Sequence, residues 1–228
     1  MDKRALILFS RLPVPGRVKT RLMPPLSGAE CAALQKAMTL DTAHTLAAMG
    51  RDLFLFHSDE GAPALLDGLP RTARLFPQSG ADLGERMYNA VAAVLAMGYG
   101  DCLLLGSDLP FLTAPEVAEA GRVLEGSDVV LCPSPDGGYW LIGMRRPFPP
   151  IFHGQRYGTG SVLDDALACC AAHGLRAGLG PVRRDLDTPE DLAWFLEELK
   201  AHAPTDASRT AAWLRTWQAG HCKPNNHS

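Results

Sequence analysis

The sequence lacks the features of a nucleic-acid-binding, membrane or secreted protein. Its formal net charge is −3, so it offers no general electrostatic attraction to nucleic acid or anionic lipid, and any phosphate must be bound by a local cluster. The apolar stretch 5–9 is too short for the core of a signal peptide, and no small-residue cleavage site follows it. We therefore expect a cytoplasmic protein with no nucleic-acid or membrane partner.

Several motifs that are typical of one chemistry are also absent. The six cysteines contain no C-x-x-C pair and mostly stand in apolar runs, which favours reduced core thiols. The sequence has no phosphate-binding loop of the G-x-x-x-x-G-K-S/T type, no H-x-x-x-H pair and no G-x-S-x-G elbow. These absences exclude the familiar ATPase phosphate loop and argue against a zinc site or a hydrolase triad.

The residues that are present fit an ordinary globular domain. Of the 228 residues, 46% are hydrophobic and 21% are charged, a balance that allows one full core. We expect one domain over residues 1–202, followed by a C-terminal helix and a polar tail over 203–228.

Apolar runs alternate with helical periodicities along the chain. We predict strands at 5–9, 52–56, 71–76, 102–106, 128–133 and 138–144, and helices at 28–49, 82–97, from about 113, at 158–173 and from 187. This alternation predicts an α/β fold, a single-domain three-layer α/β/α arrangement with a mostly parallel sheet. Such sheets bind ligands beyond the carboxyl ends of their strands, where we expect the loops after Phe9, Gly106 and Arg184 to meet.

The loop after the first strand is basic in a protein that is acidic overall. It contains Arg11, Arg17, Lys19 and Arg21 together with Gly16, in the segment SRLPVPGRVKTRL. Glycine lets a backbone approach an anion closely, and the cations can offset phosphate charge. The alternative is a basic loop that is simply solvated.

Acidic residues follow two later segments. Asp108 comes directly after an apolar strand and could bind a metal ion, although an aspartate there could instead cap the next helix. Asp185 and Asp187 lie on the same side of an extended segment, so both could reach one cation. Asp187 followed by Thr-Pro-Glu also fits a helix N-cap, and the two roles are compatible.

Two turns could contact a ligand. In PDGGYW, Asp136, Gly137, Gly138 and Tyr139 could approach a substrate, although a tight hairpin needs the same Asp-Gly-Gly. In QSGADLGERM, a weaker signal, Gln78, Gly80 and Gly84 could read a base edge.

Six segments, taken in order, allow a comparison with known families: PVPGRVKTRL, QSGADLGERM, GSDLP, PDGGYWLIG, YGTGSV and DLDTPEDL. In this order they resemble a bacterial family of glycosyltransferase-A type associated with radical-SAM and selenoprotein operons. The resemblance covers about residues 4–200. That family is distantly similar to the molybdenum-cofactor and phospholactate nucleotidyltransferases, all with the nucleotide-diphospho-sugar transferase fold.

The resemblance implies roles for individual residues. Asp108 and Asp187 match the metal-binding aspartates, which suit Mg²⁺ or Mn²⁺. Lys19, supported by Arg11 and Arg21, matches the basic first loop of the nucleotidyltransferases. Further matches place Gln78 and Gly84 at the base and Asp136 to Tyr139 at the acceptor. Two departures are that this chain has Tyr157 where relatives have tryptophan, and Ser107-Asp108 where many sugar transferases have D-x-D.

Together these features predict a metal-dependent transferase that acts at the phosphates of a nucleoside triphosphate or a nucleotide sugar. Asp108 and Lys19 are the expected catalytic residues. Both glycosyl and nucleotidyl transfer fit the residues, and the single aspartate is nearer to nucleotidyl transfer. The alternative is a module that binds a nucleotide or metabolite without turning it over.

Overall fold

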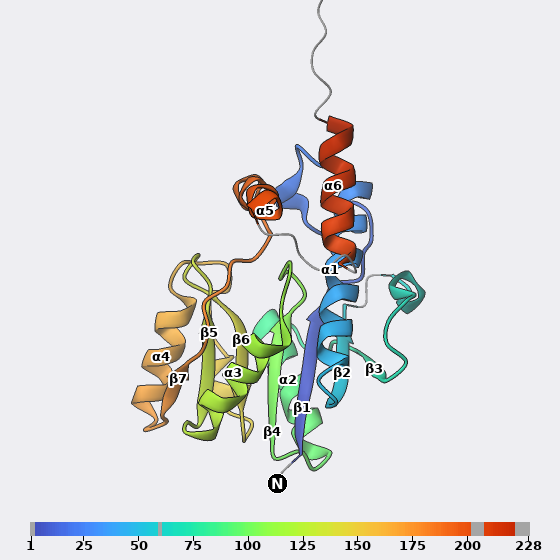
Figure 1. Cartoon of the computed structure of the whole chain (residues 1–228). Coiled ribbons are helices and arrows are strands. Elements are labelled where there is room, and N and C mark those ends of the chain that lie inside the picture. Colours follow the sequence, from blue (N-terminus) through green and yellow to red (C-terminus); the bar gives the residue numbers. More distant parts are fainter. Residues whose placement is uncertain (1–2, 59–60, 202–207, 222–228) are drawn as a thin grey trace, which may run out of the picture.

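The computed structural model describes residues 3–58, 61–201 and 208–221, and it contains a single mixed sheet within these ranges (Figure 1). Its seven strands are β1 (Arg4–Ser10), β2 (Asp52–His57), β3 (Ala73–Pro77), β4 (Asp101–Gly106), β5 (Val129–Pro133), β6 (Tyr139–Met144) and β7 (Ala177–Leu179). They lie in the order β3-β2-β1-β4-β6-β5-β7, and β6 runs antiparallel to its neighbours β4 and β5. The predicted α/β fold with a mostly parallel sheet is confirmed.

Helices cover both faces of this sheet. They are α1 (Gly28–Ala47), α2 (Leu83–Ala96), α3 (Ala114–Glu125), α4 (Val162–Ala172), α5 (Pro189–Ala201) and α6 (Arg209–His221), with short 3₁₀ turns η1 (Thr20–Leu22), η2 (Pro63–Leu66) and η3 (Pro149–Ile151). Alternate residues of β1 show the layering. Ile7 packs in the core with α2 and α4, whereas Leu6 and Leu8 pack in the core with α1 and α3. Uniformly apolar central strands are therefore buried on both faces.

A third apolar cluster lies beyond the carboxyl ends of the strands. It joins η1 and the first half of α1 to α5 and α6 through buried residues that include Leu22, Leu34, Leu186 and Phe195. Figure 1 shows α5 beside the blue N-terminal segment, above the sheet. This cluster holds η1, α1, α5 and α6 together near the sheet end at which such folds bind ligands.

The C-terminal helix α6 is attached to α1 by a cap. Asp41 accepts hydrogen bonds from the backbone N–H groups of Arg209 (3.0 Å) and Thr210 (2.8 Å), which are the free donors at a helix start. The predicted polar tail beyond His221 lies outside the described residues. None of the helices in the described ranges is long and apolar enough to cross a membrane.

Three details of the predicted elements were wrong. Helix α4 begins at Val162 rather than at 158, because Gly158 has φ 83° and the residues up to Ser161 form a turn. The strand β7 was not predicted, since three residues give no periodic signal. No strand ends at Arg184, because β7 stops at Leu179 and lies at the edge of the sheet. The segment that contains Arg184 instead crosses the sheet end as an extended chain.

Candidate active site

Lys19 stands at the centre of the polar residues at the carboxyl end of the sheet. Its Nζ donates to the carbonyl oxygen of Leu186 at 2.6 Å and to Asp187 Oδ1 at 2.7 Å, and it lies 2.7 Å from Asp108 Oδ1. The side chain is only 2% exposed. Burial alone would lower the pKa of Lys19, but the two carboxylates outweigh it and raise the pKa. The ammonium is therefore a fixed positive charge.

The backbone at Lys19 is also unusual. Its φ of 51° lies in the left-handed region, which costs a non-glycine residue on the order of 1 kcal/mol. The conformation is held from both sides, since the Lys19 carbonyl accepts from the Cys31 thiol of α1 at 3.3 Å and from Leu22 N at 2.9 Å. The loop conformation thus directs the Lys19 side chain into the protein. Lys19 therefore does not belong to a freely solvated basic loop, the alternative that the sequence left open.

Asp108 follows β4 and is supported by a buried network of hydroxyl and amide groups. Gln35 of α1 donates to Ser107 Oγ at 2.8 Å, and Ser107 Oγ donates to Ser10 Oγ at 3.0 Å, which joins the ends of β4 and β1 to α1. Gln35 was not among the predicted site residues. The available signal was a polar residue on the buried face of a predicted helix, where such a side chain needs a partner.

One carboxylate oxygen of Asp108 is buried, whereas the side chain as a whole is partly exposed. The side chain as a whole is 38% exposed, yet Oδ1 is buried and has no hydrogen-bond partner apart from the nearby Lys19 charge. Burial raises the pKa of Asp108, and Lys19 opposes this effect. Asp108 does not cap α3, because Thr113 forms that cap with Glu116.

The main chain of Leu186 links the three segments of the site. Its N–H donates to the Asp108 carbonyl at 2.9 Å, and its own carbonyl accepts from Lys19. The side chain is fully buried in the third apolar cluster, so Asp185 and Asp187 on either side of it turn the other way. Arg183 anchors the segment further, through an ion pair with Glu116. The three loops therefore meet although no strand precedes Arg184.

Asp187 does not cap α5, although the sequence was compatible with that role. The cap of α5 is made by Thr188 and Asp191: Asp191 N donates to Thr188 Oγ1 at 3.2 Å, and Thr188 N donates to Asp191 Oδ2 at 2.9 Å. Burial opposes ionisation of Asp187, but the charges of Lys19, Arg21 and Arg11 outweigh it and lower the pKa. Asp187 is held ionised, and its side chain is 43% exposed.

The oxygen atoms of the site fit a hard divalent cation. Burial, followed by the charges of Asp108 and Asp187, raises the pKa of Asp185 to about 8, and its Oδ1 is buried without a hydrogen-bond partner. Within the described ranges, no three or more His, Cys, Asp or Glu side chains form a preassembled metal cluster. Mg²⁺ is usually bound by one or two carboxylates together with substrate phosphates, so an exposed pair such as Asp108 and Asp187 suffices.

The arginines of the first loop differ from Lys19. Arg11, Arg17 and Arg21 are exposed, and Arg11 Nη1 reaches only the carbonyl of Arg17, at 3.4 Å. Arg11 and Arg21 are close enough to Asp187 to lower its pKa. Gly16, with φ 75°, opens the turn between them. These side chains are the ones that can turn to an incoming phosphate.

Gln78 and Gly84 lie in different environments. Gln78 is at the sheet end, where Nε2 donates to the carbonyls of Ser10 (3.2 Å) and Phe56 (3.1 Å), which fixes the direction of its amide oxygen. Gly84 is buried, and a Cβ there would lie 2.1 Å from the carbonyl oxygen of Phe152. The structure thus gives Gly84 a packing role, and its contact with a base stays a prediction.

The turn 135–138 borders the site from the β5–β6 side. Asp136 Oδ1 accepts from Gly138 N at 3.0 Å, and its charge also raises the pKa of the more distant Asp185. Gly137 has φ 85°, and a Cβ on it would lie 2.1 Å from the Gly160 carbonyl, so glycine is required for the turn itself. The Tyr139 hydroxyl is buried and lies next to the Tyr157 side chain, and burial raises the pKa of Tyr139. Acceptor binding by this turn stays a prediction.

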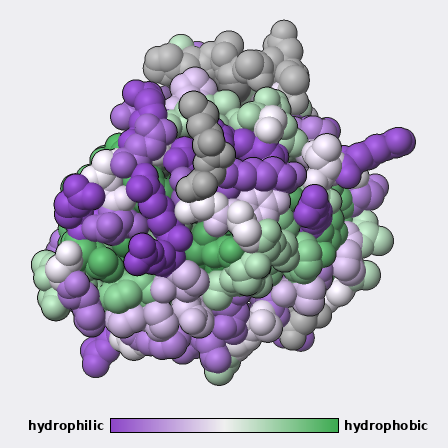
Figure 2. Space-filling model, turned by 90° about the horizontal axis from the view of Figure 1, so that it is seen from below, coloured by the Kyte–Doolittle hydropathy of each residue, from purple (hydrophilic) through white to green (hydrophobic). Residues whose placement is uncertain are grey.

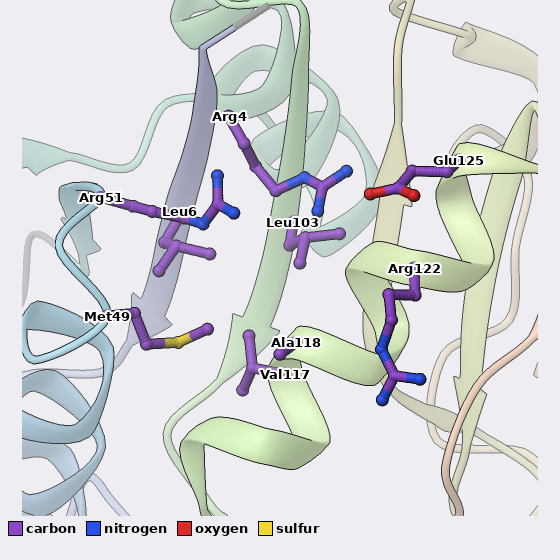
Figure 3. A pocket seen from close by; sticks show the side chains of 9 residues that line it. All are labelled: Arg4, Leu6, Met49, Arg51, Leu103, Val117, Ala118, Arg122 and Glu125. Atoms are coloured by element: carbon purple, nitrogen blue, oxygen red, sulfur yellow. The ribbon is translucent and has the colours of Figure 1, made fainter. Parts of the chain in front are cut away.

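A cavity of about 160 Å³ lies elsewhere, towards the amino ends of β1 and β4 (Figure 3). Its floor is apolar, with Leu6 and Leu103, and arginines lie around it. Arg4, however, is already paired with Asp101 through two hydrogen bonds, of which Nη2–Oδ2 is 2.8 Å. The view from below shows hydrophilic residues around smaller hydrophobic areas (Figure 2). The carboxylate pair is absent from this cavity's lining, so the candidate active site remains the group at the opposite end of the sheet.

Comparison with known proteins shows the family to which the chain belongs. Residues 39–159 match the family described as "Uncharacterized protein conserved in bacteria (DUF2064)". The chain belongs to this family. The matched residues include Asp108 but neither Lys19 nor Asp187. A relative from Phenylobacterium zucineum (strain HLK1), named 3-phospho-D-glycerate guanylyltransferase, is 35% identical over 191 residues, which cover 76% of this chain and 81% of the relative.

Solved structures give the same superfamily. A candidate nucleotide-diphospho-sugar transferase from Desulfovibrio desulfuricans G20 superposes with a TM-score of 0.87 at 31% identity, over 96% of both chains. The 4-diphosphocytidyl-2C-methyl-D-erythritol synthase of Anaerococcus prevotii DSM 20548 superposes with a TM-score of 0.56 at 12% identity. The superposition covers 87% of this chain and 99% of the synthase, and at this identity it shows the fold alone. The DUF2064 chain is therefore a transferase of the nucleotide-diphospho-sugar transferase superfamily. Its association with particular operons stays a prediction.

Proposed function

We propose that this protein is a metal-dependent nucleotidyltransferase that transfers a guanylyl group from GTP to a small phosphorylated acid. The observation that carries the proposal is the convergence of Lys19, Asp108 and Asp187, two carboxylates and one buried cation, at the carboxyl end of the sheet. The name of the 35% identical relative supports guanosine as the base and a compound such as 3-phospho-D-glycerate as the acceptor. At Asp108 the sequence is Gly-Ser-Asp-Leu-Pro rather than a D-x-D pair, which favours nucleotidyl over glycosyl transfer.

The residues divide the work of the reaction. A phosphate oxygen of the acceptor attacks the α-phosphorus of GTP, the bond from that phosphorus to the bridging oxygen breaks, and pyrophosphate leaves. Asp108 and Asp187 would hold Mg²⁺ or Mn²⁺, which supplies charge stabilisation to the phosphates when bound. Arg11 and Arg21, which are exposed, turn to the phosphates and offset the charge that develops on the leaving group.

The acceptor and the base have separate positions in this proposal. Gln78, whose amide group is fixed by two backbone carbonyls, presents its oxygen to N–H donors of the base. The turn at Asp136 to Tyr139 borders the opposite side, where the acceptor would enter. No covalent protein intermediate is needed, because the acceptor itself is the nucleophile.

A thermal-shift panel tests this proposal. We expect GTP to raise the melting temperature in the presence of Mg²⁺ or Mn²⁺, and to do so more than ATP, CTP, UTP or GDP-sugars, because a ligand that binds only the folded state stabilises it. A concentration of about 100 times Kd corresponds to about 2.7 kcal/mol of added stability. Stabilisation by a nucleotide sugar alone would favour glycosyl transfer, and no response to any nucleotide would contradict the proposal.

A further inference from the structure

The ammonium of Lys19 lies where a cation between the two carboxylates would lie. Nζ is 2.7 Å from Asp108 Oδ1 and 2.7 Å from Asp187 Oδ1, although both carboxylates are about two-fifths exposed and can be reached from solvent. The lysine side chain, by contrast, is 2% exposed. The protein alone therefore already supplies one positive charge to the carboxylates.

We propose that Lys19 is a built-in counter-cation that makes divalent-metal binding at Asp108 and Asp187 dependent on nucleotide phosphates. This proposal rests on the function proposed above and adds an order to it: the metal ion enters with the nucleotide and is bound only weakly without it. Lys19 is then a positioning residue that acts through the carboxylates, while the exposed arginines of the same loop contact the phosphates.

The charges in the site explain the dependence. The two ionised carboxylates and the ammonium by themselves have a net charge of −1, and the nearby Arg11 and Arg21 add positive charge. The ammonium repels a second cation a few ångströms away. A nucleoside triphosphate brings several negative charges and new oxygen ligands, which reverse this balance. Because coupling of two ligands is reciprocal, the metal ion must strengthen nucleotide binding by the same factor.

The fixation of Lys19 separates it from a mobile phosphate-binding lysine. Besides the two carboxylates, Nζ donates to the carbonyl oxygen of Leu186 at 2.6 Å, in a segment anchored by a fully buried side chain. The left-handed backbone at Lys19, with φ 51°, directs the side chain to this place. The ammonium thus competes with a metal ion from a position that the fold itself provides.

Manganese binding to the full chain, followed by electron paramagnetic resonance of free Mn²⁺, tests the proposal. Four proteins are compared without nucleotide: the wild type, Lys19→Met, Lys19→Arg and Lys36→Met. Lys36 is a matched control, since it forms an exposed ion pair with Asp67 outside the site. We expect Lys19→Met to bind Mn²⁺ about tenfold or more tightly than the wild type, because a like charge at this distance has effects of that size. The Lys19→Arg and Lys36→Met variants should bind Mn²⁺ as weakly as the wild type.

A second set of titrations uses the α,β-methylene analogue of GTP, which cannot be cleaved at the α-phosphorus. In the wild type we expect this analogue to increase the affinity for Mn²⁺. In Lys19→Met we expect the analogue to increase the Mn²⁺ affinity by a smaller factor. Equal or weaker Mn²⁺ binding by Lys19→Met without nucleotide would overturn the proposal. If that variant does not fold, wild-type protein that binds Mn²⁺ equally well with and without the analogue would also overturn it. Failure of the analogue to bind at all would contradict the proposed function, whereas the Mn²⁺-only comparison still decides the role of Lys19.

Discussion

Asp108→Asn should lower the turnover of the enzyme about a thousandfold while the protein remains folded. Asparagine has the same shape, but it removes the negative charge from a side chain that lies 2.7 Å from Lys19 and faces the proposed metal position. A metal ion stabilises the transition state of such a reaction by several kcal/mol, and about 4 kcal/mol corresponds to about a thousandfold in rate. Steady-state kinetics with saturating GTP and Mg²⁺ measure the effect.

The control for Asp108→Asn is Asp67→Asn. It makes the same chemical change at an exposed ion pair with Lys36, which is separate from the ion pairs that Lys19 forms with Asp108 and Asp187. We expect Asp67→Asn to keep its turnover within about twofold, since isolated surface ion pairs contribute little. If Asp108→Asn kept a tenth or more of the wild-type turnover, Asp108 would not be a metal ligand.

Asp187→Asn and Thr188→Ala should separate the chemistry of this segment from its structure. Neighbouring residues carry the two roles: Asp187 contacts Lys19, and Thr188 caps α5 with Asp191. We expect Asp187→Asn to lose at least about a hundredfold in turnover, because it removes a proposed metal ligand, and residues that only support such ligands already have effects of up to that size. Thr188→Ala should instead lower the free energy of unfolding by about 1 kcal/mol, the usual cost of a lost cap.

Urea denaturation and steady-state kinetics on both variants decide between these roles. Thr188→Ala should retain turnover within about twofold, because its side chain contacts Asp191 and not the site. The account of this segment would be wrong if Thr188→Ala lost as much turnover as Asp187→Asn, or if Asp187→Asn behaved like the wild type.

Elements with a strong local pattern were predictable from the sequence. The uniformly apolar strand that precedes Asp108 and the long amphipathic segments gave the α/β order, and the position of Asp108 after a central strand followed directly from it. The basic character of the first loop was equally visible. These features depend on a few consecutive residues, which a single sequence records.

The arrangement inside the site could not be predicted in this way. That Lys19 is buried while its arginine neighbours are exposed depends on contacts with Leu186 and Asp187, 167 and 168 residues further along the chain. The sequence also left Asp187 with two possible roles, and only the bond between Thr188 and Asp191 assigned the cap. The support from Gln35 is likewise a contact between distant segments, which no local pattern encodes.

Phosphorus NMR of one reaction shows whether this enzyme carries out metal-dependent nucleotidyl transfer. The full chain is incubated with GTP and 3-phospho-D-glycerate, with Mg²⁺ and with a chelator in parallel. We expect equal amounts of pyrophosphate and of a new diphosphate-linked product, only when metal and both substrates are present. Pyrophosphate release that is equal in the chelator sample, or no release in either sample, would contradict metal-dependent nucleotidyl transfer.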